Sequence, residues 1–521
     1  MRAFLAAVAI SISAPALAQS VTIASGKLEG VRLSTGVRAW YGVPFAAPPV
    51  RDLRWRAPHS VAKWPGIFHA DRPAPMCLQP MRFRTMNHYF GNEAISEDCL
   101  YLNVWSPPKA TKAPVIVWIY GGGFNVGSAN MANYDGGALA AKGVVRVNLA
   151  YRVGVMGFLA HPGLSREAGG ASGNYGLMDQ IAGLKWVQQN IKAFGGDPNN
   201  VTIAGQSAGS MSVALLQQSP LAKGLFHKIV GMSGSPFGPL IAPTPLATAE
   251  SQGVTLQNAL GASSIEAMRD VGGDKVLAAA ASVARDPIVI DGKVLTGSAL
   301  DTFGARKQSD VPVMLGFTRD EAFSNFGPAK TVAAYDAAVR KFFPDTAEAV
   351  LNAYPAAIDA DVPRALADLQ RDASVGRQMA GWARAQNQFG KAPIFGWYFT
   401  RRQPYAPGIT FSDHDPATVG AYHTGEVPYF FQTLDALNLF RQTRDWTADD
   451  RMMADALSTM LVSFAKTGRP AADWPAFDPA RPKLMRLDIQ RSVVDWPNYA
   501  ALDLLDAAPT PRPPAGGKPR D

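Results

Sequence analysis

The sequence is poor in charged residues, has almost no cysteine and contains no long hydrophobic run. Charged side chains make up 18% of the 521 residues, and apolar ones make up 47%. That composition excludes intrinsic disorder for most of the chain. No segment reaches the roughly 18 to 20 consecutive apolar residues that a membrane-spanning helix needs. We therefore expect a large folded protein without stable membrane insertion.

Charge of one sign is not concentrated in any part of the chain. Lys and Arg number 50 against 42 Asp and Glu, which gives a formal net charge of +8. Proteins that bind nucleic acid gather their basic residues on one face or along one helix, whereas here these residues are scattered. We therefore expect no nucleic acid among the partners of this protein.

The N-terminus predicts export. Arg2 is followed by an apolar stretch from residue 3 to about residue 12, and the tripeptide ALA ends at residue 18. This is the pattern of a secretory signal peptide with an A-x-A cleavage site. The apolar stretch is too short to span a bilayer as an anchor. We expect residues 1–18 to be removed and the mature protein to be periplasmic or secreted.

The chain has only two cysteines, Cys77 and Cys99. Outside the cytoplasm thiols oxidise, which favours a disulfide between them over two separately buried thiols. Closing that loop would stabilise the fold by roughly 3 kcal/mol through the unfolded chain. Two cysteines with no nearby histidine pair cannot form a structural zinc site, so no metal is expected.

Short apolar runs alternate with helical patterns along most of the chain. The runs are bounded by glycine, proline or polar residues, and they lie at residues 114–120, 143–149, 201–204, 228–232, 311–316 and 393–399. Runs of this kind suit strands buried on both faces of a mostly parallel sheet. Clear helical patterns lie at residues 177–194 and 449–466. The alternation predicts a doubly wound α/β architecture with helices on both sides of the sheet.

The two ends of the mature chain differ from this pattern. Residues 21–33 and 37–46 show short alternating strands, which indicate an antiparallel edge before the parallel core. Residues 508–521 are rich in proline and polar residues and predict a disordered tail. No repeat or linker separates further units, so we expect a single catalytic domain over residues 19–507.

One serine sits between glycines at the junction of a strand and a helix. Gly205-Gln206-Ser207-Ala208-Gly209 follows the apolar run VTIA and precedes a helical pattern. This is the setting of a nucleophile elbow, in which the serine occupies a strained turn and its hydroxyl projects clear of the sheet. Glycines two residues before and after remove side chains that would collide there. Ser207 is therefore the candidate nucleophile.

A run of glycines upstream suggests where an oxyanion could bind. Tyr120-Gly121-Gly122-Gly123-Phe124 closes the apolar run at 114–120. Successive glycines leave their backbone N–H groups unshielded by side chains, and such donors stabilise a developing oxyanion. A flexible turn without function is the alternative, and the elbow downstream argues against it.

Seven histidines compete for the role of base. Five come too early in the chain or flank helices and are expected to be surface or packing residues: His59, His69, His88, His161 and His227. In an α/β-hydrolase the order is serine, acid, histidine. His423 follows Gly420 and precedes an apolar segment, whereas His414 lies in the polar string SDHDP and is expected in a solvated loop. We favour His423.

The acid should follow a strand between the serine and the histidine, where a carboxylate can orient the imidazole. Asp320 and Glu321 both come just after the run at 311–316, and spacing alone does not choose between them. Asp413 and Asp415 are alternatives that we expect to form salt bridges or turns.

These motifs together resemble the type-B carboxylesterase family, which includes bacterial esterases, cholinesterases and adhesion proteins without catalysis. The resemblance covers nearly the whole mature chain. It rests on YGVPFAAPPVRDLRWRAP, SEDCLYLNVWSP, YGGGF, NYGLMDQ, FGGDPNNVTIAGQSAGS, RDEAF and GAYHTGEVPYFF. It implies an α/β-hydrolase fold and a serine carboxylesterase that works through an acyl-enzyme, with a small-molecule ester as substrate and no cofactor.

The resemblance also implies roles for individual residues. Ser207 is the nucleophile, Glu321 rather than Asp320 the acid, and His423 the base. Three backbone N–H groups form the oxyanion hole, and they belong to Gly122, Gly123 and Ala208. The family pattern further implies the Cys77–Cys99 disulfide and a supporting hydroxyl at Ser233 near the acid.

Departures from the family pattern narrow the range of esters that we expect as substrates. Gln206 stands where cholinesterase-like members have Glu, and residues 78–98, which we expect to contribute Tyr89 and Phe90 to the substrate pocket, contain no Trp. A carboxylate and a tryptophan attract quaternary ammonium, so their loss argues against choline esters. Leu240 replaces an acyl-pocket Trp, which predicts a roomier acyl site. Arg51 stands where the family often has Gly, and the sequence suggests no role for it.

Two other functions compete with a general carboxylesterase. One is a specialised hydrolase of a bulky natural or synthetic ester. The other is a non-catalytic binding module, which the complete set of catalytic residues disfavours. The motifs leave the acyl length, the alcohol group and the oligomeric state open.

Overall fold

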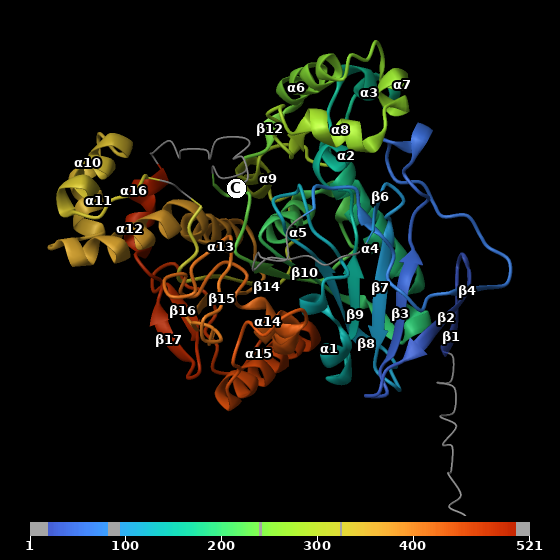
Figure 1. The fold of residues 1–521 in the computed structure, drawn as a ribbon. Helices are drawn as coiled ribbons and strands as arrows, with labels where there is room; N and C mark the ends of the chain where they lie inside the picture. The colour runs from blue at the N-terminus through green and yellow to red at the C-terminus, as the bar shows by residue number, and fades with distance from the viewer. Residues whose placement is uncertain (1–18, 82–93, 239–241, 324–325, 507–521) are drawn as a thin grey trace, which may run out of the picture.

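The fold is a large twisted sheet with helices on both faces (Figure 1). The computed structural model describes residues 19–81, 94–238, 242–323 and 326–506. The main sheet has 13 strands. In spatial order these are β1 (Gln19–Ile23), β2 (Gly26–Arg32), β3 (Arg38–Pro44), β7 (Tyr101–Ser106), β9 (Val145–Leu149), β8 (Ala113–Ile119), β10 (Gly196–Gln206), β11 (Lys228–Met232), β14 (Val313–Thr318), β15 (Ile394–Phe399), β16 (Lys483–Leu487) and β17 (Ser492–Asp495), with β4 (Ile67–His69) paired to β2.

Sixteen α-helices are present in the described residues, and two groups of them project from the body of the molecule, at the top and at the left of the view in Figure 1. One group contains α6, α7 and α8, and the other contains α10, α11 and α12. The helices are α1 (Gly137–Ala141), α2 (Gly154–Phe158), α3 (Pro162–Glu167), α4 (Tyr175–Asn190), α5 (Ala208–Gln218), α6 (Leu246–Ala259), α7 (Ile265–Asp270), α8 (Gly273–Ala280), α9 (Ala299–Gly304), α10 (Val332–Phe342), α11 (Ala347–Ala353), α12 (Val362–Arg371), α13 (Arg377–Phe389), α14 (Val427–Phe431), α15 (Ala448–Thr467) and α16 (Leu502–Asp506). Two small two-stranded sheets join β5 (Met76–Cys77) to β6 (Ile95–Ser96) and β12 (Thr244–Pro245) to β13 (Val289–Ile290).

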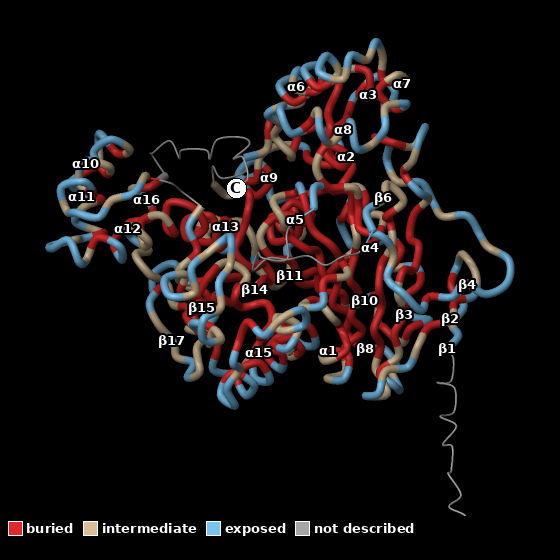
Figure 2. Tube along the Cα trace, in the orientation of Figure 1, coloured by how far each residue is buried: buried red, intermediate tan, exposed pale blue. Residues whose placement is uncertain are grey.

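The centre of the sheet is buried on both faces, as the continuous apolar runs predict. Every residue of β8, β9, β11, β14 and β15 is buried (Figure 2). The strands from β9 through β8, β10, β11, β14 and β15 to β16 pair in parallel. Continuous burial of β-branched and aromatic side chains under helices is the physical reason that parallel sheets lack polar alternation.

The predicted fold class is confirmed, and so is the antiparallel edge near the N-terminus. β1, β2, β3 and β7 pair in antiparallel fashion, and β7 continues the sheet to β9. The helical pattern at 177–194 became α4 followed by a short 3-10 helix, and the pattern at 449–466 became α15. The opposite edge, where β16 pairs antiparallel with β17, was not indicated by any of the predicted strands.

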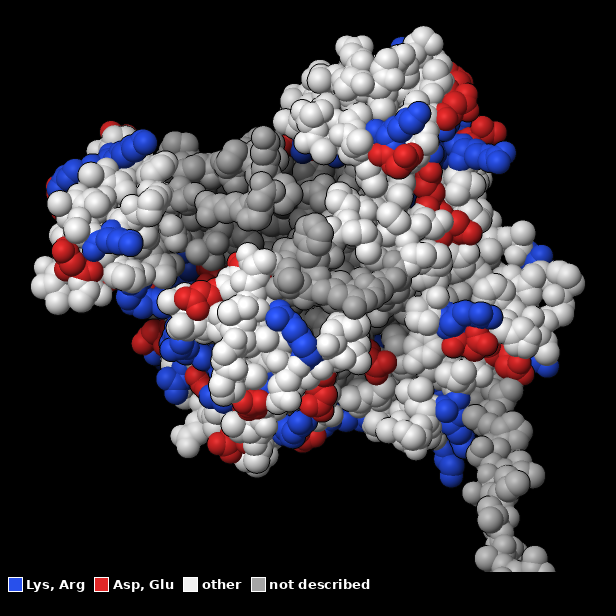
Figure 3. Space-filling model, viewed as in Figure 1, with Lys and Arg blue, Asp and Glu red and all other residues white. Residues whose placement is uncertain are grey.

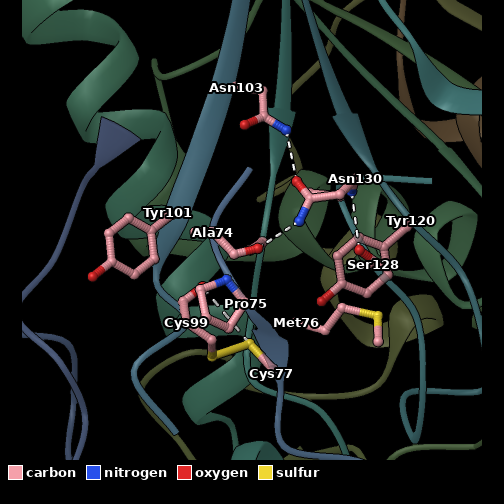
Figure 4. Close-up of a pocket in the computed structure, with 12 residues that line it drawn as sticks. Ala74, Pro75, Met76, Cys77, Cys99, Tyr101, Asn103, Tyr120, Ser128 and Asn130 are labelled. Carbon is pink, nitrogen blue, oxygen red and sulfur yellow. Dashed lines mark hydrogen bonds between the residues drawn. A yellow bond between two sulfur atoms is a disulfide. The ribbon is translucent and has the colours of Figure 1, made fainter. Parts of the chain in front are cut away.

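The predicted disulfide between Cys77 and Cys99 is confirmed, and both cysteines are buried. A cavity of about 10 Å³ lies beside it, which is room for about one water molecule (Figure 4). Asn130 lines this cavity and donates to the backbone carbonyl of Ala74 at 2.8 Å, and it accepts from Asn103 at 2.8 Å. Asn130 thus connects the segment before Cys77 to the segment that follows the glycine run.

Surface charge follows the scattered pattern of the sequence. On the face drawn in Figure 3, Lys and Arg lie among Asp and Glu and form no continuous basic patch. Within the described ranges, no helix is long and apolar enough to cross a membrane. The predicted signal peptide (1–18), the predicted tail (508–521) and three predicted pocket residues, Tyr89, Phe90 and Leu240, lie outside the described residues.

Candidate active site

Ser207 occupies the strained turn that the elbow pattern predicts. It lies between β10 and α5 with φ 58° and ψ −125°, a backbone conformation that side chains with a Cβ rarely adopt. Glycine neighbours make this turn possible, because a Cβ at Gly209 would lie 2.1 Å from the carbonyl oxygen of Ile119. A Cβ at Gly205 would lie 2.2 Å from the carbonyl oxygen of Gly209. The backbone N–H of Ser207 donates to Met232 O at 2.8 Å, which fixes the turn to β11.

The glycine run lies directly against this turn. β8 and β10 are neighbours in register, so residues after Ile119 meet residues after Gly205. A Cβ at Gly121 would lie 2.9 Å from the Cβ of Ser207. Gly122 and Gly123 have φ of 113° and 63°. In the described part of the chain no acceptor takes the N–H of either residue. Both donors are therefore available beside the serine.

A buried glutamine connects the disulfide segment to the glycine run. Gln79, two residues after Cys77, donates to Gly127 O at 2.8 Å and accepts from Gly127 N at 2.7 Å. The same amide donates to Cys77 O at 2.9 Å. Gly127 packs in turn on Gly121, since a Cβ at Gly127 would lie 2.6 Å from the Gly121 carbonyl oxygen. Gln79 therefore holds Gly127, which packs on the glycine run. No sequence pattern indicated this role of Gln79.

His423 and Glu321 are in direct contact. Nδ1 of His423 lies 2.5 Å from Oε2 of Glu321, whose carboxylate is buried. The other carboxylate oxygen accepts from the backbone N–H of Thr318 at 2.8 Å. A carboxylate held in this way orients an imidazole and stabilises its charged form. With Nδ1 donating to Glu321, the Nε2 of a neutral His423 carries the lone pair that can accept a proton.

Two side chains pack on the imidazole of His423. The Gln206 amide nitrogen lies 3.0 Å from Nε2 and 3.4 Å from Nδ1. A group on the lone-pair axis of Nε2 would be much farther from Nδ1, so these similar distances place the amide over the ring face. The ring of Phe323 is 4.6 Å away and nearly perpendicular, at 89°. These contacts limit rotation of the imidazole. Neither of them lies along the direction in which the Nε2 lone pair accepts a proton.

The side-chain hydroxyl groups of Ser207 and Ser233, both of them predicted site residues, make no hydrogen bond within the described residues. The Ser207 hydroxyl has no partner among the described residues, as is common for a nucleophile before substrate binds. Ser233 lies at the end of β11, and its N–H donates to Gly316 O at 2.8 Å. Its hydroxyl is buried without a hydrogen-bond partner in the described chain, so the structure gives it no bond to Glu321.

The competing acidic residues have other contacts. Asp320 accepts from the N–H of Ala421 at 2.7 Å and pairs with Arg364 at 2.6 Å. Asp413 lies 3.3 Å from His414, and Asp415 accepts from Ala417 N at 2.9 Å in a turn. Asp415 thus has the turn role that the sequence predicts, and Asp413 lies beside the His414 imidazole.

The expectation that His414 lies in a solvated loop is wrong. Its side chain is only 10% exposed. The ring stacks on Phe411 at 4.6 Å and on Tyr422 at 5.6 Å, and Nε2 lies 3.0 Å from the Tyr405 hydroxyl. Phe411 directly precedes the SDHDP string, whereas Tyr405 and Tyr422 come from segments on either side of it, and together they cover the ring. Local polarity therefore did not indicate its burial.

Glu426 is a buried carboxyl group near the acid. Both of its carboxylate oxygens lack a hydrogen-bond partner in the described chain. Burial, with the charge of Glu321 as the second cause, raises the pKa of Glu426 well above its ordinary value. Across the described residues no group of three His, Cys, Asp or Glu side chains could hold a metal ion.

The model of the carboxylesterase family matches residues 17–503 of the chain. The chain belongs to the carboxylesterase family. A fumonisin B1 esterase of Sphingopyxis macrogoltabida is 39% identical over 478 residues, which are 87% of this chain and 84% of that protein. The para-nitrobenzyl esterase of Bacillus subtilis (strain 168) is 33% identical over 503 residues, which are 92% of this chain and 96% of that protein.

Solved structures agree with this membership. A PNB esterase structure superposes with a TM-score of 0.78 at 31% identity, and the match covers 94% of this chain and 99% of that one. A thermophilic PNB esterase gives the same TM-score of 0.78 at 31% identity. The carboxylesterase family assignment gives the chain an α/β-hydrolase fold and a serine esterase activity on carboxylic esters, as the motifs indicate.

The close approach at the elbow predicts the effect of Gly209→Ala. The added methyl group meets the backbone of Ile119, which cannot move without disturbing β8. We expect a loss of about 3 kcal/mol or more in the free energy of unfolding, measured by urea denaturation. Gly304→Ala is the control, because a Cβ there meets nothing within 4 Å. That variant should be unchanged or more stable by up to about 1 kcal/mol. Equal stabilities of the two variants would contradict the steric argument.

The buried carboxyl group of Glu426 predicts a pH-dependent stability. Because its pKa is higher in the folded than in the unfolded state, its contribution is fully present below the unfolded pKa and is lost as pH rises. Glu426→Gln removes this dependence. The melting temperature of the variant relative to wild type should therefore increase from pH 5 to pH 8, measured by calorimetry. Glu348→Gln, at a side chain 75% exposed, serves as the control. A difference that stays constant with pH would refute the expectation.

Proposed function

We propose that Ser207, His423 and Glu321 are the nucleophile, base and acid of this carboxylesterase. The contact of 2.5 Å between Glu321 and His423 is the observation that carries the proposal. Support also comes from the strained turn at Ser207, which exposes a nucleophile in α/β-hydrolases. The chain order of serine, acid and histidine is that of the fold.

The reaction proceeds in two halves. Nε2 of His423 takes the hydroxyl proton of Ser207 as its oxygen attacks the ester carbonyl carbon. The tetrahedral intermediate collapses, and the imidazolium gives its proton to the leaving alcohol. Water then attacks the acyl-enzyme with the same base, and the acid product leaves. Glu321 keeps the Nδ1 proton of the imidazole in place throughout and stabilises the positive charge.

The oxyanion is stabilised by backbone N–H groups of Gly122, Gly123 and Ala208. The free donors of the glycine run and its contact with the serine support this assignment. Ala208 is the first residue of α5, where N–H groups have no partner within the helix. Each donor contributes roughly 3 kcal/mol to lowering the barrier.

The substrate is a carboxylic ester other than a choline ester, and a bulky alcohol or acyl group is the second candidate. The position of Gln206 over the imidazole, where cholinesterase-like members have a carboxylate, supports the exclusion of cationic esters. The relatives named as a fumonisin B1 esterase and a para-nitrobenzyl esterase motivate the second candidate. The predicted pocket residues Leu240, Tyr89 and Phe90 would set its size.

A panel of p-nitrophenyl esters from acetate to palmitate tests the catalytic proposal. Ser207→Ala and His423→Ala should lower kcat by about 10⁶-fold, because each is a member of one catalytic unit. Glu321→Gln should lower kcat by about 10⁴-fold through loss of the imidazole orientation. Circular dichroism should show an unchanged fold. Turnover retained by purified Ser207→Ala would refute the proposal, and the chain-length profile of wild type would measure the acyl pocket.

We also propose that the protein is exported and that residues 19–507 form its catalytic domain. The signal-peptide pattern and the Cys77–Cys99 disulfide support export. N-terminal sequencing of the protein expressed with residues 1–18 in a bacterial host should begin at Gln19 in the exported fraction. A protein that retains Met1 and remains in the cytoplasm would contradict this prediction.

A further inference from the structure

A cluster of buried polar side chains lies behind the loop that carries His423. Gln403, Tyr422 and Arg444, which we name the Gln403 cluster, come from three separate segments and are 5%, 5% and 1% exposed. The catalytic steps assign no role to any of the three side chains. Buried polar groups are costly unless they are fully hydrogen-bonded, so such a cluster needs a structural or functional reason.

Gln403 bonds to the chain on both sides of His423. Its amide nitrogen donates to the carbonyl oxygen of Gly425 at 2.9 Å. Its amide oxygen accepts from the Tyr422 hydroxyl at 2.9 Å and from Nε of Arg444 at 2.7 Å. Tyr422 directly precedes His423, and Gly425 follows it by two residues. One side chain therefore connects the two flanks of the histidine.

The Arg444 guanidinium is itself held in place. It lies over the ring of Tyr405 at 3.8 Å, and one of its nitrogens lies 3.3 Å from the Tyr422 hydroxyl. The backbone N–H of Arg444 donates to the Asn438 side chain at 2.9 Å. Gln403 is thus bonded to a guanidinium whose own position is fixed.

The other side of the loop is held by the turn that follows β14, which contains Asp320 and Glu321. Asp320 N donates to Ala421 O at 3.0 Å, and the Asp320 carboxylate accepts from Ala421 N at 2.7 Å. Gly420 has φ 64°, and a Cβ there would lie 2.2 Å from the Asp320 carboxylate. The loop of residues 420–425 therefore lies between the Asp320–Glu321 turn and the Gln403 cluster.

This loop needs such support because its backbone is strained. Thr424, the residue after His423, has φ 77°. A β-branched residue in the left-handed region is an outlier, and it persists only where surrounding contacts fix the conformation. If the turn relaxed, the imidazole next to Thr424 would move relative to both Glu321 and Ser207. A displacement of about 1 Å can lower a catalytic rate about 100-fold.

We propose that Gln403 is a positioning residue for His423, because it holds the strained loop 420–425 in the conformation that keeps the imidazole on Glu321. The inference rests on the proposed role of His423 as base. Gln403 is buried and bonds to Tyr422, Gly425 and Arg444, so we expect its effect on the catalytic step and not on substrate binding.

Gln403→Met tests the inference, because it keeps the side-chain volume and removes all three hydrogen bonds. We expect kcat on p-nitrophenyl butyrate to fall about 10- to 100-fold, with KM within about twofold of wild type. Gln217→Met is the matched control, since Gln217 is also buried and bonds to Trp382 and Gln386. It should lower the melting temperature without changing kcat at a temperature where both variants are folded. A kcat of Gln403→Met equal to that of wild type, or lowered no more than in Gln217→Met, would overturn the inference.

Tyr422→Phe provides a second variant if Gln403→Met does not fold. It removes one hydroxyl from the Gln403 cluster, and we expect kcat to fall about 3- to 10-fold with KM unchanged. An unchanged kcat in that variant also overturns the inference. His423→Ala separates the two proposals. If it retains full activity, the proposed function fails. If it is inactive while Gln403→Met is fully active, only the positioning role fails.

Discussion

The distance between the carboxyl ends of β8 and β10 is the constraint on which the active site depends. The two strands pair in parallel, and at their carboxyl ends a Cβ at Gly121 would lie 2.4 Å from the carbonyl oxygen of Gln206. Only glycine allows this approach. It brings the N–H groups after Ile119 next to the serine, so nucleophile and oxyanion donors are placed by the same strand pairing. The sheet therefore determines the geometry of the site more than any single side chain does.

The site is surrounded by groups that cost stability. Ser207 and Thr424 have positive φ, and Glu426, Ser233 and Thr318 have buried side-chain oxygens without partners in the described chain. Each feature costs on the order of 1 to 3 kcal/mol. The large core of the central sheet, in which every residue of β8, β9, β11, β14 and β15 is buried, can bear this cost. Strain and orphaned polar groups at one end of a sheet are typical of sites built for catalysis.

The sequence predicted local geometry well and long-range contacts poorly. Apolar runs located the central strands, and the glycine spacing located the elbow at Ser207. In contrast, Gln403 lies in a polar stretch with no motif, and its partners come from two other segments. The burial of His414 likewise depends on aromatic residues outside its own polar string. Arg51 is exposed with φ 52°, so the glycine that the family often has there would relieve a left-handed backbone.

The disulfide is linked to the glycine run, so the oxidation state of Cys77 and Cys99 affects how firmly that run is held. Cys77 and Cys99 close a segment from which Gln79 holds Gly127, and Gly127 packs on the glycine run beside Ser207. Reduction would free that segment while the buried sheet keeps the fold together. A chain with reduced thiols would therefore keep the fold but would position the glycine run beside Ser207 less firmly.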